Sequence, residues 1–390
     1  MAGFSPRNAW LQLRYRWDHG TGAWASAHQL ADTAPFSEQL DSLLVREEPR
    51  LAVGYQGFPS GGRHVVPFLR EQLERSGDEV TVTERRGRRR STADGADILF
   101  TGCGSGQAAA LPAENSLVLP FRIQQILEVL PDMEAMSKKV SRNERKQFAN
   151  LRAKNDWAWE RGHTMADLEF FYERMHLPTM GFRHGKATRS ADWDTAVNCL
   201  FQRGALFFVT EGGKRVAGVL VRLDDDRRIL RARLLGVLDG DEKHYRSGAV
   251  KALWYLGMEC SVGHEKIEQM DMSGGEPFPG KGVFQFKRRL HPLTELPTDH
   301  FRDKRLHLRV LRDTDAVRDF LVFTPVIAVD EAGKLTAVHF ADAERPAHTR
   351  IVGTGPGIES SRVIDLDEFL AGLERVTTPV GFDLDEAEAA

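Results

Sequence analysis

The segment between residues 206 and 237 constrains the fold most, because it holds three consecutive β-rich runs with short connections. The first two runs, 206–210 and 215–223, are joined through Gly212 and Gly213. Adjacent glycines supply the positive φ angles that a tight hairpin turn needs. The third run is 229–237. Short β-rich runs joined in this way pair with their neighbours, so the sequence predicts an antiparallel meander.

A helix and two further strands are expected after the meander. Residues 247–263 carry apolar side chains at helical spacing, with Ser247 in a position to cap the first turn. We then expect a strand at 267–272, a glycine- and proline-rich loop at 273–282, and a last strand at 283–290. The region therefore predicts one mixed or antiparallel sheet flanked by a long helix, with residues 215–223 as its central strand.

The first part of the chain alternates strand-like and helix-like segments. Residues 51–55 and 97–100 have the composition of strands, whereas 65–75 has apolar residues at helical spacing. This alternation predicts an α/β lobe. The glycine-rich stretch 101–106 lacks the Lys-Ser/Thr pair of a phosphate-binding Walker loop. A tight turn made of small residues is therefore the favoured interpretation.

A basic segment at 133–154 lies between these two regions, is expected to be helical, and is followed by a second expected helix at 167–175. We expect the basic segment to face a groove between lobes, where it would bind an anion such as CoA or tRNA. From charge alone, a solvated helix face is the commoner explanation. The cations are Lys138, Lys139, Arg142, Arg145, Lys146, Arg152 and Lys154.

A chain of 390 residues exceeds what one hydrophobic core supports, so more than one domain is expected. The predicted fold class is α/β (α+β). We place an N-terminal α/β lobe at 1–132, a second lobe at 133–297 and a small C-terminal extension at 298–390. The extension contains a hairpin-like segment, 326–339, and a helix candidate, 365–373.

The composition also sets the expected environment of the protein. No run of about 18 uncharged apolar residues occurs, and the first ten residues lack the apolar run of a signal peptide. Cys103, Cys199 and Cys260 are far apart and odd in number, which suits reduced thiols. We therefore expect a cytoplasmic protein with no membrane span and no metal site.

Several motifs occur in an order that resembles the FemABX-like branch of the GNAT acyltransferase superfamily, over residues 119–297. They are the basic helix, the hairpin Gly-Gly-Lys-Arg-Val-Ala-Gly at 212–218, the long helix, Gln-Met-Asp-Met-Ser-Gly at 269–274, and Gly-Val-Phe-Gln-Phe-Lys-Arg-Arg at 282–289. The resemblance implies two GNAT-like lobes with a mixed, largely antiparallel sheet, and an enzyme that transfers an acyl or aminoacyl group to an amine or hydroxylamine.

The expected donor follows from a departure within this resemblance. Acetyl-CoA-dependent members hold the CoA pyrophosphate with a Gln/Arg-x-x-Gly-x-Gly/Ala loop at a helix N-terminus. Here the corresponding residues, 243–249, read Lys-His-Tyr-Arg-Ser-Gly-Ala and do not fit. An aminoacyl-tRNA co-substrate is therefore favoured over acyl-CoA, with tRNA as a possible partner, a small molecule as acceptor, and no bound cofactor.

The resemblance also implies the catalytic residues. It places Lys287, which follows Phe286, near the reacting carbonyl, where an ammonium stabilises the oxyanion. Asp271 alternates with two methionines, so on a strand its side chain faces the opposite way and can orient the acceptor amine or take its proton. The alternative is an exposed Lys-Arg-Arg run and a plain surface aspartate.

The remaining candidates bind the two substrates. Arg142, Arg145, Arg246 and Phe286 are expected on the donor side, and Arg183 and His184, in the loop 178–185, on the acceptor side. A structural salt bridge is the commoner fate of an arginine such as Arg246. Two other functions stay open, namely an acyl-CoA-dependent N-acyltransferase and a non-catalytic GNAT scaffold that binds RNA or another anion.

Overall fold

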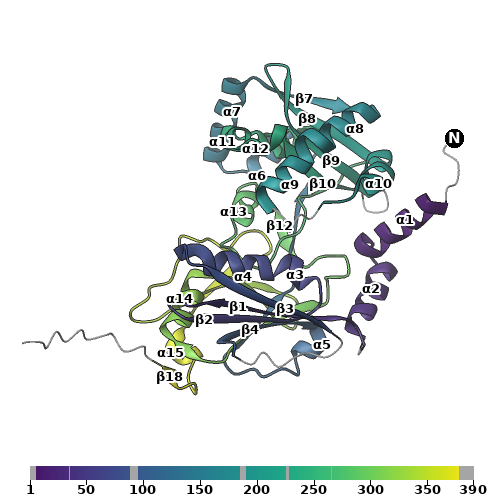
Figure 1. The fold of residues 1–390 in the computed structure, drawn as a ribbon. Coiled ribbons are helices and arrows are strands. Elements are labelled where there is room, and N and C mark those ends of the chain that lie inside the picture. The colour runs from purple at the N-terminus through teal and green to yellow at the C-terminus, as the bar shows by residue number, and fades with distance from the viewer. Residues whose placement is uncertain are drawn as a thin grey trace, which may run out of the picture.

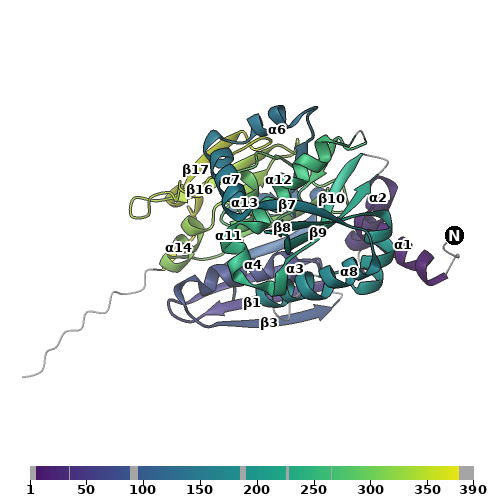
Figure 2. The ribbon, with the colours of Figure 1, turned by 90° about the horizontal axis from the view of Figure 1, so that it is seen from above.

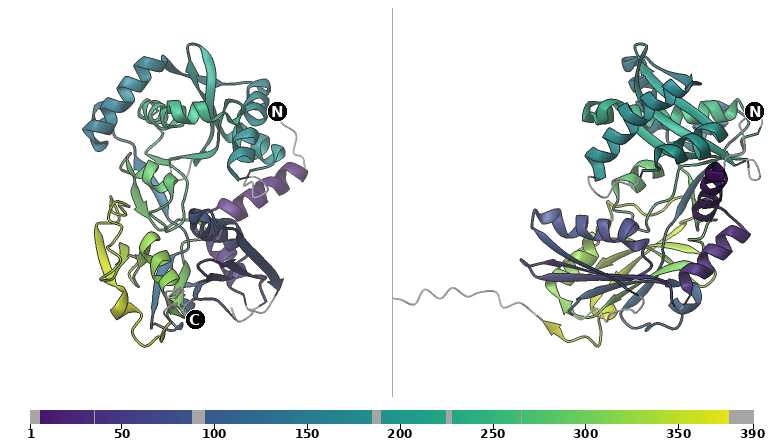
Figure 3. Two further views of the ribbon diagram at one scale, coloured as in Figure 1. Left: turned by 60° about the vertical axis from the view of Figure 1, so that its left-hand side comes forward. Right: turned by 45° about the vertical axis from the view of Figure 1, so that its right-hand side comes forward.

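The computed structural model describes residues 6–34, 36–87, 95–184, 190–224, 228–264 and 266–376. They form two α/β lobes, each built around its own sheet, with helices α1 (Pro6–His19) and α2 (Ala23–Thr33) lying beside the junction of the lobes (Figures 1 and 3). Among these residues, no helix is long and apolar enough to cross a bilayer.

The first lobe contains a six-stranded sheet in the order β3-β1-β2-β4-β13-β5. Neighbouring strands are antiparallel except for the parallel pair β2 and β4. Helices α4 and α14 contribute Phe68 and Phe320 to the core of this lobe. The strands are β1 (Gln39–Arg46), β2 (Leu51–Gly57), β3 (Val80–Gly87), β4 (Ile98–Gly104), β5 (Ser116–Pro120) and β13 (Lys304–Val310).

Short elements complete the first lobe. The predicted hairpin at 326–339 is confirmed, because β15 and β16 pair antiparallel, and β17 adds a parallel third strand. The elements are α3 (Gly61–His64), α4 (Val66–Leu73), η1 (Glu74–Ser76), α5 (Ser105–Ala108), β14 (Asp313–Thr314), α14 (Asp315–Phe323), β15 (Val326–Val329), β16 (Leu335–Ala341), β17 (Ser360–Asp365), α15 (Leu366–Phe369) and β18 (Arg375–Val376).

The second lobe contains a seven-stranded sheet in the order β12-β6-β11-β10-β9-β8-β7. The predicted meander is confirmed as β8, β9 and β10, and the sheet is antiparallel except between β10 and β11. The strands are β6 (Gln124–Glu128), β7 (Trp157–Gly162), β8 (Gly204–Glu211), β9 (Lys214–Asp224), β10 (Ile229–Val237), β11 (Gln269–Asp271) and β12 (Leu293–Glu295).

Helices cover both faces of this second sheet. Helix α12 (Ala249–Val262) connects β10 to the parallel β11 and packs on one face through a row of buried apolar residues. On the other face, Phe171 and Met175 pack against the meander. The approach is close, because a Cβ built on Gly236 would lie 2.5 Å from the backbone of Met175. Glycine is therefore required at that position of β10.

The other elements of the second lobe surround this sandwich. They are α6 (Met133–Lys139), α7 (Arg142–Asn155), α8 (Met165–Phe171), η2 (Tyr172–His176), α9 (Leu177–His184), α10 (Trp193–Thr195), η4 (Ala196–Leu200), η5 (Phe201–Arg203), η6 (Leu238–Gly240), α11 (Glu242–Ser247) and α13 (Gly282–Arg288).

Several local expectations are wrong. The expected strand at 283–290 is helix α13, whose buried residues Phe284 and Lys287, with Leu290 after them, recur every three residues as a helix requires. The glycine-rich stretch 101–106 is not a turn, since it continues β4 and begins α5. Ser247 does not cap α12, because it ends α11 and only Gly248, at φ 92°, separates the two helices.

Two further expectations need correction. The expected loop at 178–185 is mostly helical, as α9 runs to residue 184. The basic segment 133–154 is helical but interrupted, because Ser141 caps α7 by accepting a hydrogen bond from the Glu144 N–H at 3.2 Å. A serine that can bond the free N–H groups of a following turn starts a new helix.

The sheets do not follow the expected domain boundaries. Strand β6 lies before residue 132 yet belongs to the second sheet, and β13 lies after residue 297 yet sits inside the first sheet, between β4 and β5. The chain therefore runs from the first lobe to the second and back, and the 298–376 segment is part of the first lobe.

Truncation after residue 297 should consequently abolish folding of the first lobe, because β4 and β5 would lose the strand that joins them. We expect rapid proteolysis between residues 39 and 120 and loss of near-ultraviolet circular dichroism. A matched chain ending at Val376 retains every described strand and should resist proteolysis. A 1–297 fragment with cooperative unfolding and a protected first lobe would contradict this assignment.

Candidate active site

A cleft of about 690 Å³ lies between the two lobes. Its walls come from α1 and α2, from the 59–64 and 297–301 segments of the first lobe, and from β10, β11 and residues 190–195 of the second. Charged and histidine side chains dominate these walls. They are Arg14, Asp18, His19, His28, Asp32, Arg63, His64, Arg122, Asp192, Arg231, Arg233, Asp271, Asp299 and His300.

Asp271 lies in the wall of this cleft at the end of β11. The expected alternation is confirmed, because Met270 and Met272 are buried in the core under α12 while Asp271 lines the cleft. In the parallel register Asp271 lies opposite Arg231, and their side chains form an ion pair of 2.5 Å. Gln124 donates a second hydrogen bond, at 3.3 Å. The carboxylate is therefore held in one orientation by groups on the two neighbouring strands, β10 and β6.

Ser273 links Asp271 to Lys287. The Ser273 backbone has φ 68°, its N–H donates to Asp271 at 2.8 Å, and its hydroxyl donates to the Ala232 carbonyl at 2.6 Å. The Ser273 carbonyl accepts a hydrogen bond of 2.8 Å from the Lys287 ammonium. Lys287 thus holds the turn that follows Asp271 from the side away from the cleft, and it is not among the residues that line the cleft.

The position of Lys287 changes its protonation equilibrium. The side chain is buried, and this burial lowers the pKa of Lys287 to about 8, with Asp271 opposing the shift and Arg122 adding to it. The ammonium form still predominates at neutral pH. A modest rise in pH converts it to the neutral amine, which no longer carries charge toward Ser273.

Glu276 forms a second buried charge cluster beside the cleft. It pairs with Lys281 at 2.7 Å, with His64 at 3.4 Å and with Arg122 at 3.7 Å. Burial alone would raise the pKa of Glu276, but His64, Arg122 and Lys281 hold it well below its usual range. Because His64 follows β2 whereas Glu276 follows β11, this carboxylate ties the two lobes together.

Three arginines of the cleft are available to pair with a ligand. Among the described residues, Arg14, Arg63 and Arg233 have no carboxylate partner, and the Nε atom of Arg233 is buried without a hydrogen bond. His19 is exposed at the cleft wall. An anionic group of a ligand would pair with the free arginines.

The wall also holds five aspartates, which balance its five arginines in formal charge, and Asp18, Asp192 and Asp299 have no ion-pair partner among the described residues. Asp271 pairs with Arg231, and Asp32 pairs with Lys304. Asp192 accepts from the Thr195 N–H and Asp299 from the Phe301 N–H, as local caps.

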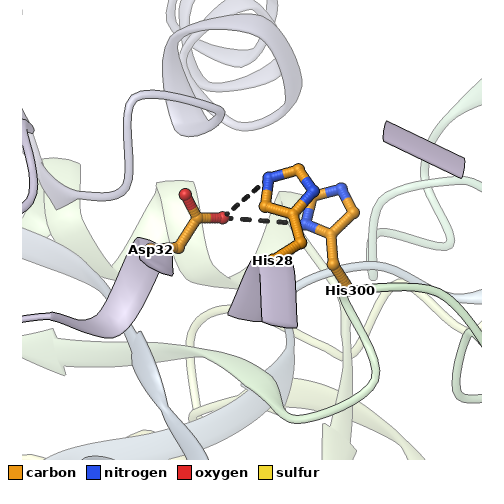
Figure 4. Close-up of side chains that lie close together, drawn as sticks. All are labelled: His28, Asp32 and His300. Carbon is orange, nitrogen blue, oxygen red and sulfur yellow. Dashed lines mark ion pairs between the residues drawn. The ribbon is translucent and has the colours of Figure 1, made fainter. Parts of the chain in front are cut away.

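His28, Asp32 and His300 meet where α2 contacts the first lobe (Figure 4). Their potential ligand atoms lie within 4.8 Å of one another, and the two imidazole rings stack at 3.8 Å. The buried Lys304 ammonium donates to Asp32 and, at 2.7 Å, to His300. A cation therefore already neutralises this carboxylate, so the cluster is better explained as a clamp that holds α2 than as a metal site.

The expected donor-side residues lie away from this cleft. Arg142 and Arg145 are on α7, which packs on the second lobe through Phe148, on the side opposite α1 and α2 (Figures 1 and 2). The expectation that the basic segment faces the groove between the lobes is therefore wrong. Arg246 is exposed and pairs with Glu242 at 2.9 Å.

The other expected binding residues are not in the cleft wall. Phe286 is partly buried against the core under α12. Arg183 and His184 end helix α9, and their side chains lie outside the described part of the chain. Of all the expected site residues, Asp271 and Lys287 are therefore the two that the described structure links, through Ser273.

Sequence reasoning missed the arginines of the cleft. Arg231 and Arg233 alternate within a strand that is otherwise apolar, and this spacing puts both on one face. That signal was available, because two like charges on one face of a central strand require a solvated or ligand-binding surface. The contributions of Arg14 and Arg63 depend on contacts between distant parts of the chain and left no local signal.

Comparison with protein-family models and with curated proteins gave no match. Among solved structures, the chain is similar to L-PGS from Bacillus licheniformis (11% identity, TM-score 0.37, 83% of this chain and 98% of that chain). It is also similar to FemX (11%, 0.38, 79% and 96%) and to a GCN5-related N-acetyltransferase from Kribbella flavida (13%, 0.25, 88% and 79%). These values are too low to assign a family or an activity.

Replacing Asp32 by Asn should destabilise the protein, because the buried Lys304 would lose its anionic partner. Burial would raise the pKa of Asp32, but His300 and Lys304 lower it to about 2 from 3.8. Because the pKa of Asp32 is lower in the folded protein than in the unfolded chain, the ionised carboxylate adds about 2 kcal/mol to the free energy of unfolding at pH values above 4. This contribution is lost as the pH falls from 4 toward 2.

Chemical denaturation between pH 2 and 7 checks this expectation. Asp32→Asn should lower the free energy of unfolding at pH 7 and reduce the loss of stability between pH 4 and 2 by about 2 kcal/mol. Asp18→Asn, which changes a cleft aspartate without an ion-pair partner among the described residues, is the matched control. Equal stability of Asp32→Asn and wild type at pH 7 would show that the clamp contributes nothing.

Proposed function

We propose that this protein is an acyltransferase that joins an activated acyl or aminoacyl group to the amine or hydroxylamine of a small, anionic acceptor in the cleft between the lobes. The observation that supports this most is the fixed Asp271 carboxylate in a cleft that also holds three arginines without a carboxylate partner among the described residues. The resemblance of the sequence to FemABX-like transferases points to the same reaction class.

Asp271 would receive the acceptor amine. Its carboxylate is oriented by Arg231 and Gln124, and it opens toward the cleft, where an incoming ammonium would complete its set of partners. Holding the nitrogen at one place converts a collision into a positioned attack. The carboxylate would first take a proton from the ammonium, which frees the lone pair for attack. As the new C–N bond forms, the acyl–oxygen bond of the donor breaks, and the released oxygen takes up a proton. The unpaired arginines would hold a carboxylate or phosphate of the same acceptor.

Lys287 would act on the reaction through the turn at Ser273. Its ammonium fixes the Ser273 carbonyl, and so it holds in place the residue whose N–H donates to Asp271. Its positive charge also lies just behind the wall in which Asp271 stands, where it favours negative charge on a carbonyl oxygen in the cleft. Lys287 is therefore proposed as a positioning and electrostatic residue.

An aminoacyl-tRNA is the proposed donor. The exposed cations Arg142, Lys146 and Lys154 on α7 offer a phosphate-binding strip on the outside of the second lobe. Helix α11 leads directly into α12 through Gly248, so the segment that would hold a CoA pyrophosphate is itself helical. A donor as large as tRNA can contact α7 and still place its acylated end in the cleft. The alternative donor is acyl-CoA.

Lys287→Met should lower kcat on the order of 10²-fold, because a loosened turn at Ser273 misplaces Asp271 relative to the reacting groups. The variant removes the charge and keeps most of the stem. Folding should be little affected, because a buried ammonium with a lowered pKa does not stabilise the native state below pH 8. Transfer of labelled amino acid from mixed aminoacyl-tRNA to a low-molecular-mass extract measures the rate.

The pH dependence separates this role from a merely structural one. Wild-type turnover should fall as the pH rises through about 8, because Lys287 loses its proton there. The Lys287→Met variant should lack that descending limb, and the exposed-site control Lys334→Met should keep it. Normal turnover in Lys287→Met, or an unchanged limb, would rule out the proposed role.

Charge reversal on α7 tests the donor. The double variant Arg142→Glu and Arg145→Glu should weaken tRNA binding at least tenfold at low salt, and wild-type affinity should fall steeply as salt rises. Filter binding with unfractionated tRNA measures both effects. If tRNA binding is absent and acyl-CoA instead raises the thermal midpoint, the donor is acyl-CoA; if neither occurs, the acyltransferase proposal fails.

A further inference from the structure

Large apolar side chains are exposed most densely on the first two helices. Of the fourteen large apolar residues that are exposed in the described part of the chain, five lie between positions 10 and 36, and each of these is between 37% and 74% exposed. Such clustering on one short segment marks an interaction surface rather than scattered surface leucines. The five residues are Trp10, Leu13, Trp24, Leu30 and Phe36.

Helix α1 has two apolar faces. Leu11 and Tyr15 form the buried face, and Tyr15 packs under Arg222 at 4.5 Å. Trp10, Leu13 and the partly exposed Trp17 recur at i, i+3 and i+7, so they form a second stripe that points away from the protein. Packing within the chain explains the first face and the position of Trp17, which stacks on His28, and leaves Trp10 and Leu13 exposed.

Helix α2 repeats this arrangement. Ala25 is buried and Asp32 faces Lys304, so that side holds α2 on the first lobe. Trp24, Ala27 and Ala31 are exposed at i, i+3 and i+7. The helices are held in one unit, because the Trp17 ring stacks on His28 at 4.8 Å. The exposed stripes of both helices, with Leu30 and Phe36, are called the α1–α2 face below.

The charges around the α1–α2 face are positive. Arg14 and Arg16 are exposed and flank the stripe of α1 on its two sides. Asp18 lines the cleft, as Arg14 also does, and Asp32 pairs with Lys304. The face therefore combines tryptophans with flanking arginines, and its exposed carboxylate, Glu38, lies 3.9 Å from Arg86.

We propose that the α1–α2 face binds the interfacial region of an anionic lipid bilayer. Tryptophan rings occupy the headgroup level of a bilayer, and arginines beside them bury their stems while their guanidinium groups bind lipid phosphates. A helix with an apolar stripe and basic flanks lies in the plane of such an interface. This surface is independent of the proposed reaction, although α1 and α2 also form one wall of the cleft.

A second copy of this chain fits the face less well. A two-fold contact would place the same face against itself, which brings Arg14 and Arg16 of one copy toward those of the other. Like charges around a small apolar patch oppose such a contact. An anionic surface has the complementary charge and imposes no such repulsion.

Vesicle flotation with the full chain tests the proposal. The protein should float with vesicles of phosphatidylcholine and phosphatidylglycerol, should float poorly with phosphatidylcholine alone, and should lose binding as salt rises. The double variant Trp10→Ser and Trp24→Ser should lower the fraction bound at least tenfold, and Arg16→Glu should lower it at low salt. Val363→Ser, which removes an exposed apolar residue from β17, is the matched control.

Each other result decides against the proposal. Equal flotation with both vesicle types would show that charge does not select the surface. Undiminished flotation of the double variant, with an unchanged thermal midpoint, would place the lipid contact elsewhere. If no flotation occurs at low salt but sedimentation shows a dimer that the double variant abolishes, the α1–α2 face is an interface between copies of this chain.

Discussion

The buried ion pair between Arg231 and Asp271 is the interaction on which the candidate site depends. The two residues face each other across the parallel strands β10 and β11, and each side chain is nearly inaccessible to solvent. Moving two charges out of water costs several kcal/mol per ion, so the pair persists only because its geometry and extra hydrogen bonds compensate. Removing either partner would leave an uncompensated charge beside the cleft.

The same pair organises what surrounds it. Asp271 fixes the turn at Ser273, and Lys287 closes that turn from behind. Arg231 reaches Asp224 at 3.3 Å, which extends the network to the next strand. The position of one carboxylate is thus set by β6, β9, β10, β11 and α13 together. A site built on strands and a helix in this way varies little in geometry, which a positioned acyl transfer requires.

Local patterns in the sequence predicted the meander, helix α12 and the direction in which Asp271 faces, because each of these follows from a spacing within a few residues. The helix α13 was mistaken for a strand, since Val-Phe-Gln-Phe has the alternation of a strand and its helical period shows only when Phe284, Lys287 and Leu290 are considered together. The basic residues of α7 predicted that this helix is exposed, but they could not predict on which side of the second lobe it lies.

Non-local pairing accounts for most of the remaining differences. Nothing near β13 indicates that it enters the first sheet between β4 and β5, because that position is decided by strands some 200 residues earlier. The cleft has the same origin, since its walls come from α1, α2 and both lobes. A constellation such as Arg14, Arg63 and Arg233 forms only when the chain has returned to its first lobe.

Turnover of Asp271→Asn measures the central claim most directly. The substitution keeps the shape of the side chain and removes the charge that is proposed to hold the acceptor amine. The account predicts a fall in kcat/KM on the order of 10²-fold in transfer from aminoacyl-tRNA, with unchanged tRNA affinity and a folded protein by circular dichroism. Wild-type turnover in this variant would contradict the assignment of the reaction to the cleft between the lobes.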